Sequence, residues 1–154
     1  MLSRFLDKKT KIHFMNLSKL IQTYPNDQEL GKRIRTNFAS SFETRPWGWF
    51  EVLTVDPTYK VKRFVVVSGK RLSYQYHNNR TEQWVIVQGT GNFILNAINH
   101  EVKAGDVLTI KPGDYHRIHN IGVEDLIVIE TQLGICDESD IVRIDDDFNR
   151  NTYV

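Results

Sequence analysis

Residues 74–84, YQYHNNRTEQW, place a glutamine, a histidine and a glutamate close together in the chain, at Gln75, His77 and Glu82. Alternate residues of a β-strand point to one face, so Gln75 and His77 point the same way. Glu82 follows a short turn, and a hairpin would return it beside them. A second histidine, His116, opens a later expected strand directly after PGDY. We expect these side chains to bind one divalent ion, because amide oxygen, imidazole and carboxylate groups suit zinc, nickel or iron.

The elements that must position these residues are short β-strands. From Trp47 onward, β-branched and aromatic residues are punctuated by turn residues at near-regular spacing, which is typical of a β-sandwich or barrel. No long helical pattern separates consecutive strands, so we expect antiparallel sheets. The expected strands are 49–55, 59–67, 71–77, 83–89, 91–97, 106–111, 116–121 and 126–132.

The first 40 residues have a different pattern. Residues 14–22 carry apolar side chains at helical spacing, Pro25 interrupts them, and residues 27–38 form a second short helical pattern. We therefore divide the chain into a short helical N-terminal extension at 1–40 and a barrel with a C-terminal tail at 41–154.

Composition excludes several classes of protein. A chain of 154 residues suits one fold, and its 40% hydrophobic and 25% charged content is ordinary for a globular protein. Its apolar runs, such as 64–67, are far shorter than the roughly 20 residues of a membrane helix, and the charged N-terminus does not resemble a secretory signal. Cys136 is the single cysteine, which excludes an internal disulfide and fits the cytoplasm. A net charge of +1 without a basic helical stripe argues against nucleic-acid binding.

Two separate sets of residues resemble the two sequence motifs of the cupin superfamily. Gln75 stands where the first motif usually has a histidine, and Lys111 stands where the second usually has a proline. The resemblance implies a small antiparallel cupin (jelly-roll) barrel, all-β, with the four expected ligands around one metal ion. The residues that match are Gly69, Gln75, His77, Glu82 and Gly89 in the first motif, and Gly105, Gly113, His116 and Asn120 in the second.

The segments RPWGWFEVL, LSYQYH, PGDYHRIHN and DIVRIDDDFNR make the resemblance narrower. Together, residues 42–150 look like the C-terminal isomerase domain of type II mannose-6-phosphate isomerases, which commonly follows a mannose-1-phosphate guanylyltransferase domain. The resemblance implies a metal-dependent isomerase, with zinc as the expected ion, that interconverts mannose 6-phosphate and fructose 6-phosphate for GDP-mannose and polysaccharide synthesis. It also implies a homodimer, because such cupins commonly pair. The first 40 residues are too few for the guanylyltransferase domain.

The expected reaction requires charged residues besides the metal ligands. Arg80 matches the arginine of the family's R-x-E-x-W turn and is the expected catalytic or substrate-orienting residue. Lys62, Arg63 and Arg71 are candidates for binding the substrate phosphate. Arg71 shares strand parity with Gln75 and His77, so we expect it to point inward with them. Asp147 is a candidate for the catalytic base.

The catalytic base is the hardest residue to assign from the sequence. Many relatives carry further histidines after the one at His77, but this chain has Asn78 and Asn79, which cannot accept a proton at neutral pH. A metal-bound water is the alternative to Asp147. The alternative is therefore that the chain is a non-catalytic cupin that binds a sugar phosphate or sugar nucleotide. A third reading, an iron-dependent oxygenase, is disfavoured by Gln75, because oxygenases of this fold usually keep a histidine there.

Overall fold

The structure is a computed structural model that describes residues 22–23, 26–32 and 41–150. The chain forms two compact units, Met1–Glu43 and Thr44–Val154. In the first unit residues 27–32 are helical, and Asn26 Oδ1 caps this turn by accepting from the Glu29 backbone N–H at 2.9 Å. The remainder of the expected helical extension lies largely outside the described residues, so the boundary at residue 40 stays a prediction. No helix in the described ranges is long and apolar enough to cross a membrane.

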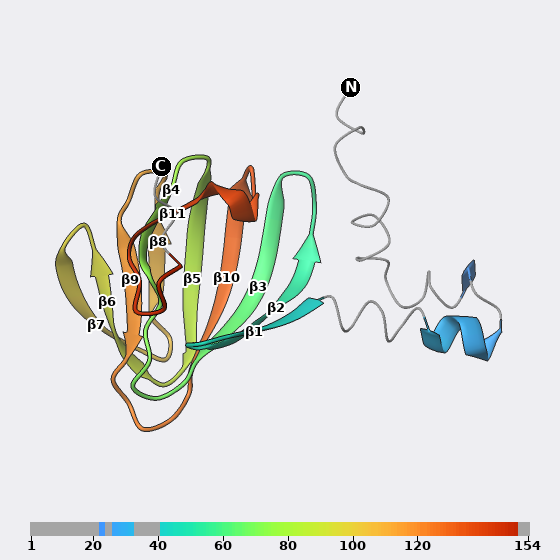
Figure 1. Cartoon of the computed structure of the whole chain (residues 1–154), viewed down its shortest axis with the longest axis horizontal. Coiled ribbons are helices and arrows are strands. Elements are labelled where there is room, and N and C mark those ends of the chain that lie inside the picture. The colour runs from blue at the N-terminus through green and yellow to red at the C-terminus, as the bar shows by residue number, and fades with distance from the viewer. Residues whose placement is uncertain (1–21, 24–25, 33–40, 151–154) are drawn as a thin grey trace. The chain divides into compact units, whose positions relative to one another are not determined.

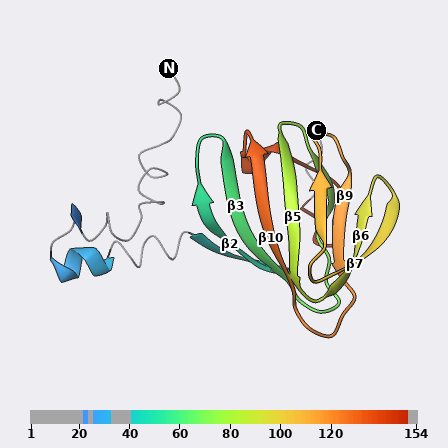
Figure 2. The same cartoon turned by 180° about the vertical axis from the view of Figure 1, so that it is seen from behind.

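The second unit is built from two antiparallel β-sheets (Figure 1, Figure 2). One sheet has six strands in the order β1-β2-β3-β10-β5-β8, and the other has five in the order β11-β4-β9-β6-β7. The strands are β1 (Phe42–Arg45), β2 (Gly48–Val55), β3 (Tyr59–Val66), β4 (Tyr74–His77), β5 (Arg80–Gln88), β6 (Thr90–Leu95), β7 (Ile98–Lys103), β8 (Val107–Ile110), β9 (His116–Asn120), β10 (Leu126–Gly134) and β11 (Ile141–Asp145). A short 3₁₀-helix, η1 (Glu138–Asp140), precedes β11.

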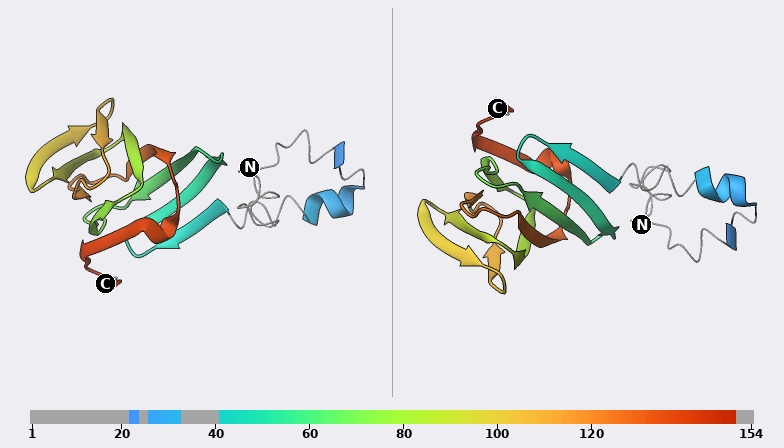
Figure 3. Two further views of the ribbon diagram at one scale, coloured as in Figure 1. Left: turned by 90° about the horizontal axis from the view of Figure 1, so that it is seen from above. Right: turned by 90° about the horizontal axis from the view of Figure 1, so that it is seen from below.

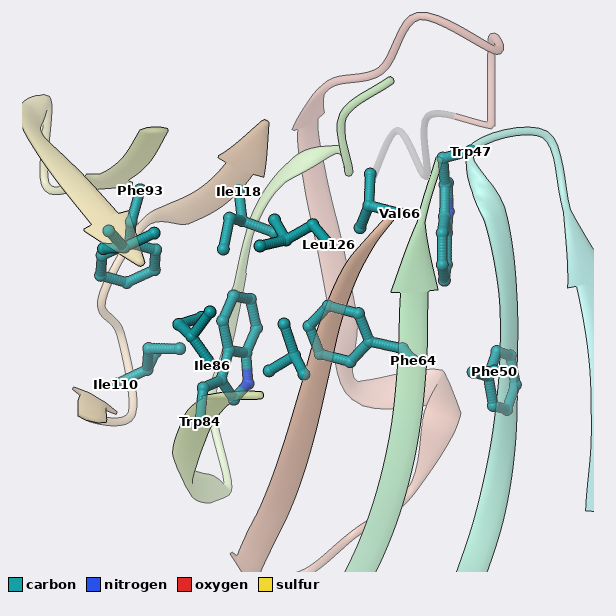
Figure 4. Packing of buried hydrophobic residues seen from close by; sticks show 12 residues of the cluster. Trp47, Phe50, Phe64, Val66, Trp84, Ile86, Phe93, Ile110, Ile118 and Leu126 are labelled. Atoms are coloured by element: carbon teal, nitrogen blue, oxygen red, sulfur yellow. The ribbon is translucent and has the colours of Figure 1, made fainter. Parts of the chain in front are cut away.

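The core lies between the two sheets, which Figure 3 shows as two facing layers. Alternate side chains of each central strand are buried, as the period of a β-strand requires. The centre of the core is aromatic: Trp84 packs edge-to-face on Phe64 at a ring distance of 5.1 Å and on Phe93 at 5.7 Å (Figure 4). Trp84 also packs edge-to-face on His116 at a ring distance of 5.5 Å, so the aromatic core borders the polar residues described below.

The all-β, antiparallel architecture confirms the expectation from the sequence, with corrections to its strands. Residues 71–73 do not continue β4, which begins at Tyr74; Arg71 forms only an isolated bridge with His119. The sequence reading also missed the strands at 42–45, 98–103 and 141–145. The segments 42–45 and 98–103 are mostly exposed and polar, so they lack a clear apolar pattern. The segment 141–145 is partly buried and apolar, but it lies within an acidic stretch.

Candidate metal centre

Three of the expected metal ligands meet between the two sheets. His77 ends β4, Glu82 lies near the start of β5 and His116 opens β9. His77 Nε2 lies 3.2 Å from Glu82 Oε1, and His116 Nε2 lies 3.7 Å from Glu82 Oε2. All three side chains are buried, and one ligand atom of each lies within 4.8 Å of the others. Residues far apart in the sequence are therefore brought within reach of a single ion.

Hydrogen bonds orient both imidazole rings for this role. His116 Nδ1 lies 2.9 Å from the Asp114 carbonyl oxygen, and His77 Nδ1 lies 3.4 Å from that of Asp140. Burial lowers the pKa of His77 to about 3, with help from the nearby Arg80 charge, and lowers the pKa of His116 to about 4. Both rings are therefore neutral at pH 7, with the proton on Nδ1 and the Nε2 lone pair directed at Glu82. Outer contacts of this kind fix the tautomer in metal-binding histidines.

The chemistry of these groups fits a divalent cation. Two imidazole lone pairs and a carboxylate are all acceptors, so they repel one another unless a cation or a donor lies between them. His116 Nε2 is buried and has no hydrogen-bond partner among the described residues. Two neutral nitrogens and one carboxylate oxygen form a donor set that zinc and related ions accept.

Gln75, the fourth expected ligand, lies next to this cluster. It is directly paired with His116 across β4 and β9, and its side chain is buried. Its Oε1 accepts a hydrogen bond from Ser73 Oγ at 2.6 Å. One lone pair of this oxygen is thus engaged and a second is available, so coordination by Gln75 stays a prediction.

Arg80 links the cluster to the rest of the barrel. Its Nε donates to Glu82 Oε1 at 2.8 Å, its Nη1 donates to the Asp137 carbonyl at 2.9 Å, and its Nη2 lies 3.1 Å from His77 Nε2. The side chain is 2% exposed. A buried arginine is tolerated here because the Glu82 carboxylate and a carbonyl satisfy its donors. The structure thus brings Arg80 to the predicted metal ligands.

A cavity adjoins the cluster on the side of Arg80 and Gln75. The cavity itself has a volume of about 80 Å³ and opens to solvent. Two carboxylates, Glu130 and Glu138, also line it. Its cationic lining residues are Arg45, Lys62, Arg80, Arg143 and Arg150. The excess of positive charge suits an anionic ligand.

One of the four other residues predicted from the sequence lines this cavity, and the other three do not. Lys62 lines it and contacts the carboxylate of Glu138. Arg63 points elsewhere: its side chain is 43% exposed and pairs with Glu51. Arg71 and Asp147 bind each other through two hydrogen bonds of 2.6 and 2.8 Å, and neither lines the cavity. Arg71 does not share the inward direction of Gln75, because the regular strand begins only at Tyr74.

Glu130 is a polar residue of the cavity that the sequence reading missed. It lies on β10 directly opposite Trp84, and its carboxylate accepts from Trp84 Nε1 at 3.2 Å and from Gln132 Nε2 at 3.2 Å. Burial, and then the nearby Glu82 charge, raise the pKa of Glu130 to about 7. The available signal was its position within LIVIETQ, where the alternation of apolar residues gives Glu130 the same inward parity as Leu126 and Val128.

Comparisons with known proteins agree with this geometry. The sequence profile of a family described as "Mannose-6-phosphate isomerase C-terminal" matches residues 33–146. The chain is 35% identical to the mannose-1-phosphate guanylyltransferase ManC of Salmonella typhimurium over 107 residues, 69% of this chain and 22% of that protein. It is 36% identical to the xanthan biosynthesis protein XanB of Xanthomonas campestris over 116 residues, 69% of this chain and 23% of that protein. The chain thus spans about a fifth of the length of these curated relatives.

Solved structures share the fold at lower identity. The capsular polysaccharide assembling protein CapF from Staphylococcus aureus aligns with a TM-score of 0.62 and 20% identity, over 68% of this chain and 34% of that one. The cupin domain of Schizosaccharomyces pombe Cnp3 aligns with a TM-score of 0.55 and 22% identity, over 56% of this chain and 64% of that one. These likenesses confirm the expected cupin barrel.

Proposed function

Because the chain belongs to the mannose-6-phosphate isomerase C-terminal family, we propose that it is a metal-dependent aldose–ketose isomerase. The proposed reaction interconverts mannose 6-phosphate and fructose 6-phosphate and feeds the synthesis of GDP-mannose and polysaccharides. The observation that carries the proposal is the meeting of His77, Glu82 and His116 beside a cation-lined cavity. A carbonyl at one end of the substrate and a phosphate at the other match these two features.

In this proposal His77, Glu82 and His116 hold the ion, with Gln75 as the fourth ligand. We take zinc as the first ion to test. When bound, the ion supplies Lewis-acid polarisation of the substrate carbonyl. Arg80 stands between the ligands and the cavity and would orient the sugar by donating to its oxygens, since guanidinium groups are donors only.

The proton that moves between C1 and C2 requires a base, and we assign this role to Glu130. Its carboxylate lines the cavity, and two neighbouring donors fix it in place. A carboxylate held there can accept the proton from one carbon and return it to the other. Asp147 is less suited, because its carboxylate is engaged by Arg71 outside the cavity.

A second candidate function is sugar-phosphate binding without catalysis. The observation that favours it concerns Asn78 and Asn79, which replace histidines of many relatives. Both asparagines donate to the carboxylate of Asp140, from their backbone N–H groups and from their side-chain amides. They hold η1 against β4 and cannot move protons, so catalysis depends on a different group.

The test is turnover by the purified chain. It should be stripped of metal, loaded in turn with zinc and other divalent ions, and supplied with mannose 6-phosphate, with fructose 6-phosphate as the measured product. We expect turnover with at least one ion and none in His77→Ala. The matched control is His100→Ala, since His100 is exposed on β7. Failure of every ion, together with measurable binding of the sugar phosphate, would favour the non-catalytic binder.

The site of action and the assembly form part of the same proposal. We place the reaction in the cytoplasm, where the free thiol of Cys136 would stay reduced. The homodimer stays a prediction, and light scattering of the purified chain would measure it.

A further inference from the structure

Three arginines that line the cavity were not among the site residues predicted from the sequence. They are Arg45, Arg143 and Arg150. Arg143 on β11 is directly paired with Gln75 on β4. Directly paired residues share a face and have Cβ atoms about 4.5–5.5 Å apart, so Arg143 lies beside the expected fourth metal ligand. Arg45 from β1 and Arg150 after β11 line the same cavity. The close approach of β11 to the first strands of the barrel is visible in Figure 3.

Arg143 forms no ion pair with a carboxylate of the described residues, whereas three other cations of the cavity do. Arg150 forms two hydrogen bonds with Asp146 through Nε and Nη2, Arg80 is bound to Glu82, and Lys62 contacts Glu138. The Nε of Arg143 is buried with no hydrogen-bond partner. A buried donor without a partner costs free energy, which a ligand that accepts from it would recover.

The electrostatics at this position also favour an added anion. Burial, followed by repulsion from Arg150 and Arg45, lowers the pKa of Arg143. The Asp146 carboxylate, which Arg150 binds, offsets part of this repulsion, but Arg143 still lies close to two other guanidinium groups. An anion that binds between them relieves this repulsion as well as satisfying the donors.

We propose that Arg143, flanked by Arg45 and Arg150, binds the phosphate group of a phosphorylated hexose. A phosphate monoester is largely a dianion at pH 7, and a guanidinium fork can bind two of its oxygens at once. Because Arg143 is the cross-strand neighbour of Gln75, a phosphate bound there leaves the sugar directed at the metal ligands. This assignment rests on the proposed function for its substrate and replaces Arg63 and Arg71 as phosphate ligands.

The test uses a ligand that cannot react. Mannitol 1-phosphate has a phosphate and a hexose carbon chain but no carbonyl, and mannitol lacks the phosphate. Isothermal titration of the full chain should show binding of mannitol 1-phosphate and weaker or no binding of mannitol. We expect Arg143→Ala to raise the Kd for mannitol 1-phosphate about tenfold or more, as loss of a charge-assisted bidentate contact implies. Arg143→Lys, which keeps the charge but not the fork, should lie between.

A matched control removes one positive charge elsewhere. Lys103→Ala changes an exposed residue of β7, at the opposite edge of the five-stranded sheet from β11, and should leave the Kd unchanged. Circular dichroism and the zinc content of each variant check that the fold and the metal centre are kept. If Arg143→Ala does not fold, Arg143→Lys carries the test, and a Kd for it equal to that of the wild type would overturn the proposal.

The outcomes separate this inference from the proposed reaction. An unchanged Kd in Arg143→Ala, or a tenfold rise only in Arg63→Ala or Arg71→Ala, overturns the phosphate assignment even if the chain is an isomerase. No binding of mannitol 1-phosphate by the wild type also overturns it. Binding that depends on Arg143 in a chain with no isomerase activity supports the assignment and leaves the non-catalytic function.

Discussion

Arg80 Nη2 lies 3.1 Å from His77 Nε2, the nitrogen whose lone pair His77 would offer to a metal ion. The same guanidinium donates to Glu82, the carboxylate of the cluster. Arg80 and a metal ion therefore compete for the same acceptors. A guanidinium is always protonated in proteins and cannot itself become a ligand.

This competition predicts the effect of Arg80→Ala. The variant should bind zinc at least as tightly as the wild type, because a competitor for His77 has been removed. Its turnover of mannose 6-phosphate should fall about 100-fold or more, the usual cost of removing a positioned donor. Zinc affinity by competition with a chelator and kcat from product formation would measure the two effects. Loss of zinc in Arg80→Ala would contradict the competition and make Arg80 a support of the metal site.

The histidines predict the metal content. His116→Ala should reduce bound zinc from one ion per chain to almost none, since it removes one of the three buried ligands. The matched control is His119→Ala, three residues later on the same strand and outside the cluster. Elemental analysis after dialysis gives the stoichiometry. Equal zinc in both variants would exclude His116 as a ligand.

Glu130 predicts a pH dependence of stability. Its pKa is raised in the folded protein, from an ordinary value of 4.5 to about 7, so folding favours its protonated form. Its contribution to stability is full below about pH 4.5 and is lost as the pH rises to about 7. The side chain of Glu130→Gln stays neutral. Its free energy of unfolding should therefore rise relative to that of the wild type between pH 5 and pH 8, by on the order of 1–3 kcal/mol.

The measurement is urea unfolding of both proteins in EDTA, because a bound cation would hold Glu130 ionised. Rotation of the Gln132 amide would let its unpaired Oε1 accept from the new amide at position 130. The control is Glu101→Gln, an exposed carboxylate on β7. A stability difference between Glu130→Gln and the wild type that does not change with pH is the result that would refute the raised pKa.

Replacement of Asn120 should lower the stability of the fold without changing the metal site. Its Nδ2 donates to the carbonyls of Val66 and Glu124, at 2.7 and 2.8 Å, and its Oδ1 accepts from the Gly122 N–H at 2.9 Å. Asn120→Ala leaves the buried Val66 carbonyl unpaired and removes two part-buried hydrogen bonds, so it should lower the free energy of unfolding by about 2–3 kcal/mol. Asn99→Ala, an exposed change on β7, should have almost no effect. Zinc content should stay the same in both variants, because Asn120 lies outside the metal cluster.

The residues that the sequence located well belong to regular elements. Gln75 and His77 share a face because β4 is regular between them, and the short turn before β5 returns Glu82 to the same place. The same parity rule failed for Arg71, since the chain before Tyr74 leaves the strand. The alternation of side chains predicts which way a residue points only within a regular strand. The residue at which β4 begins could not be located from the sequence.

Glu130 and Arg143 were missed for a different reason. Each is a charged residue whose role depends on a partner distant in the sequence: Glu130 on Trp84, and Arg143 on Gln75. The parity of Glu130 was readable, but its hydrogen-bond donors were not. Arg143 is the only basic residue among the acids of residues 137–147, so the charge of this segment did not indicate an anion-binding residue. The pairing of β11 with β4 is what brings Arg143 to the cavity.

The position of Arg143 on β11 also ties the stability of this strand to ligand occupancy. β11 lies at an edge of its sheet and pairs with β4 alone among the described strands. A phosphate held by Arg143 must be released before β11 can open, so local opening and ligand release are coupled equilibria. A ligand present at a hundred times its Kd would make this opening costlier by about 2.7 kcal/mol. Amide hydrogens of β11 should then exchange about 100-fold more slowly, which makes the strand an internal reporter of the bound state.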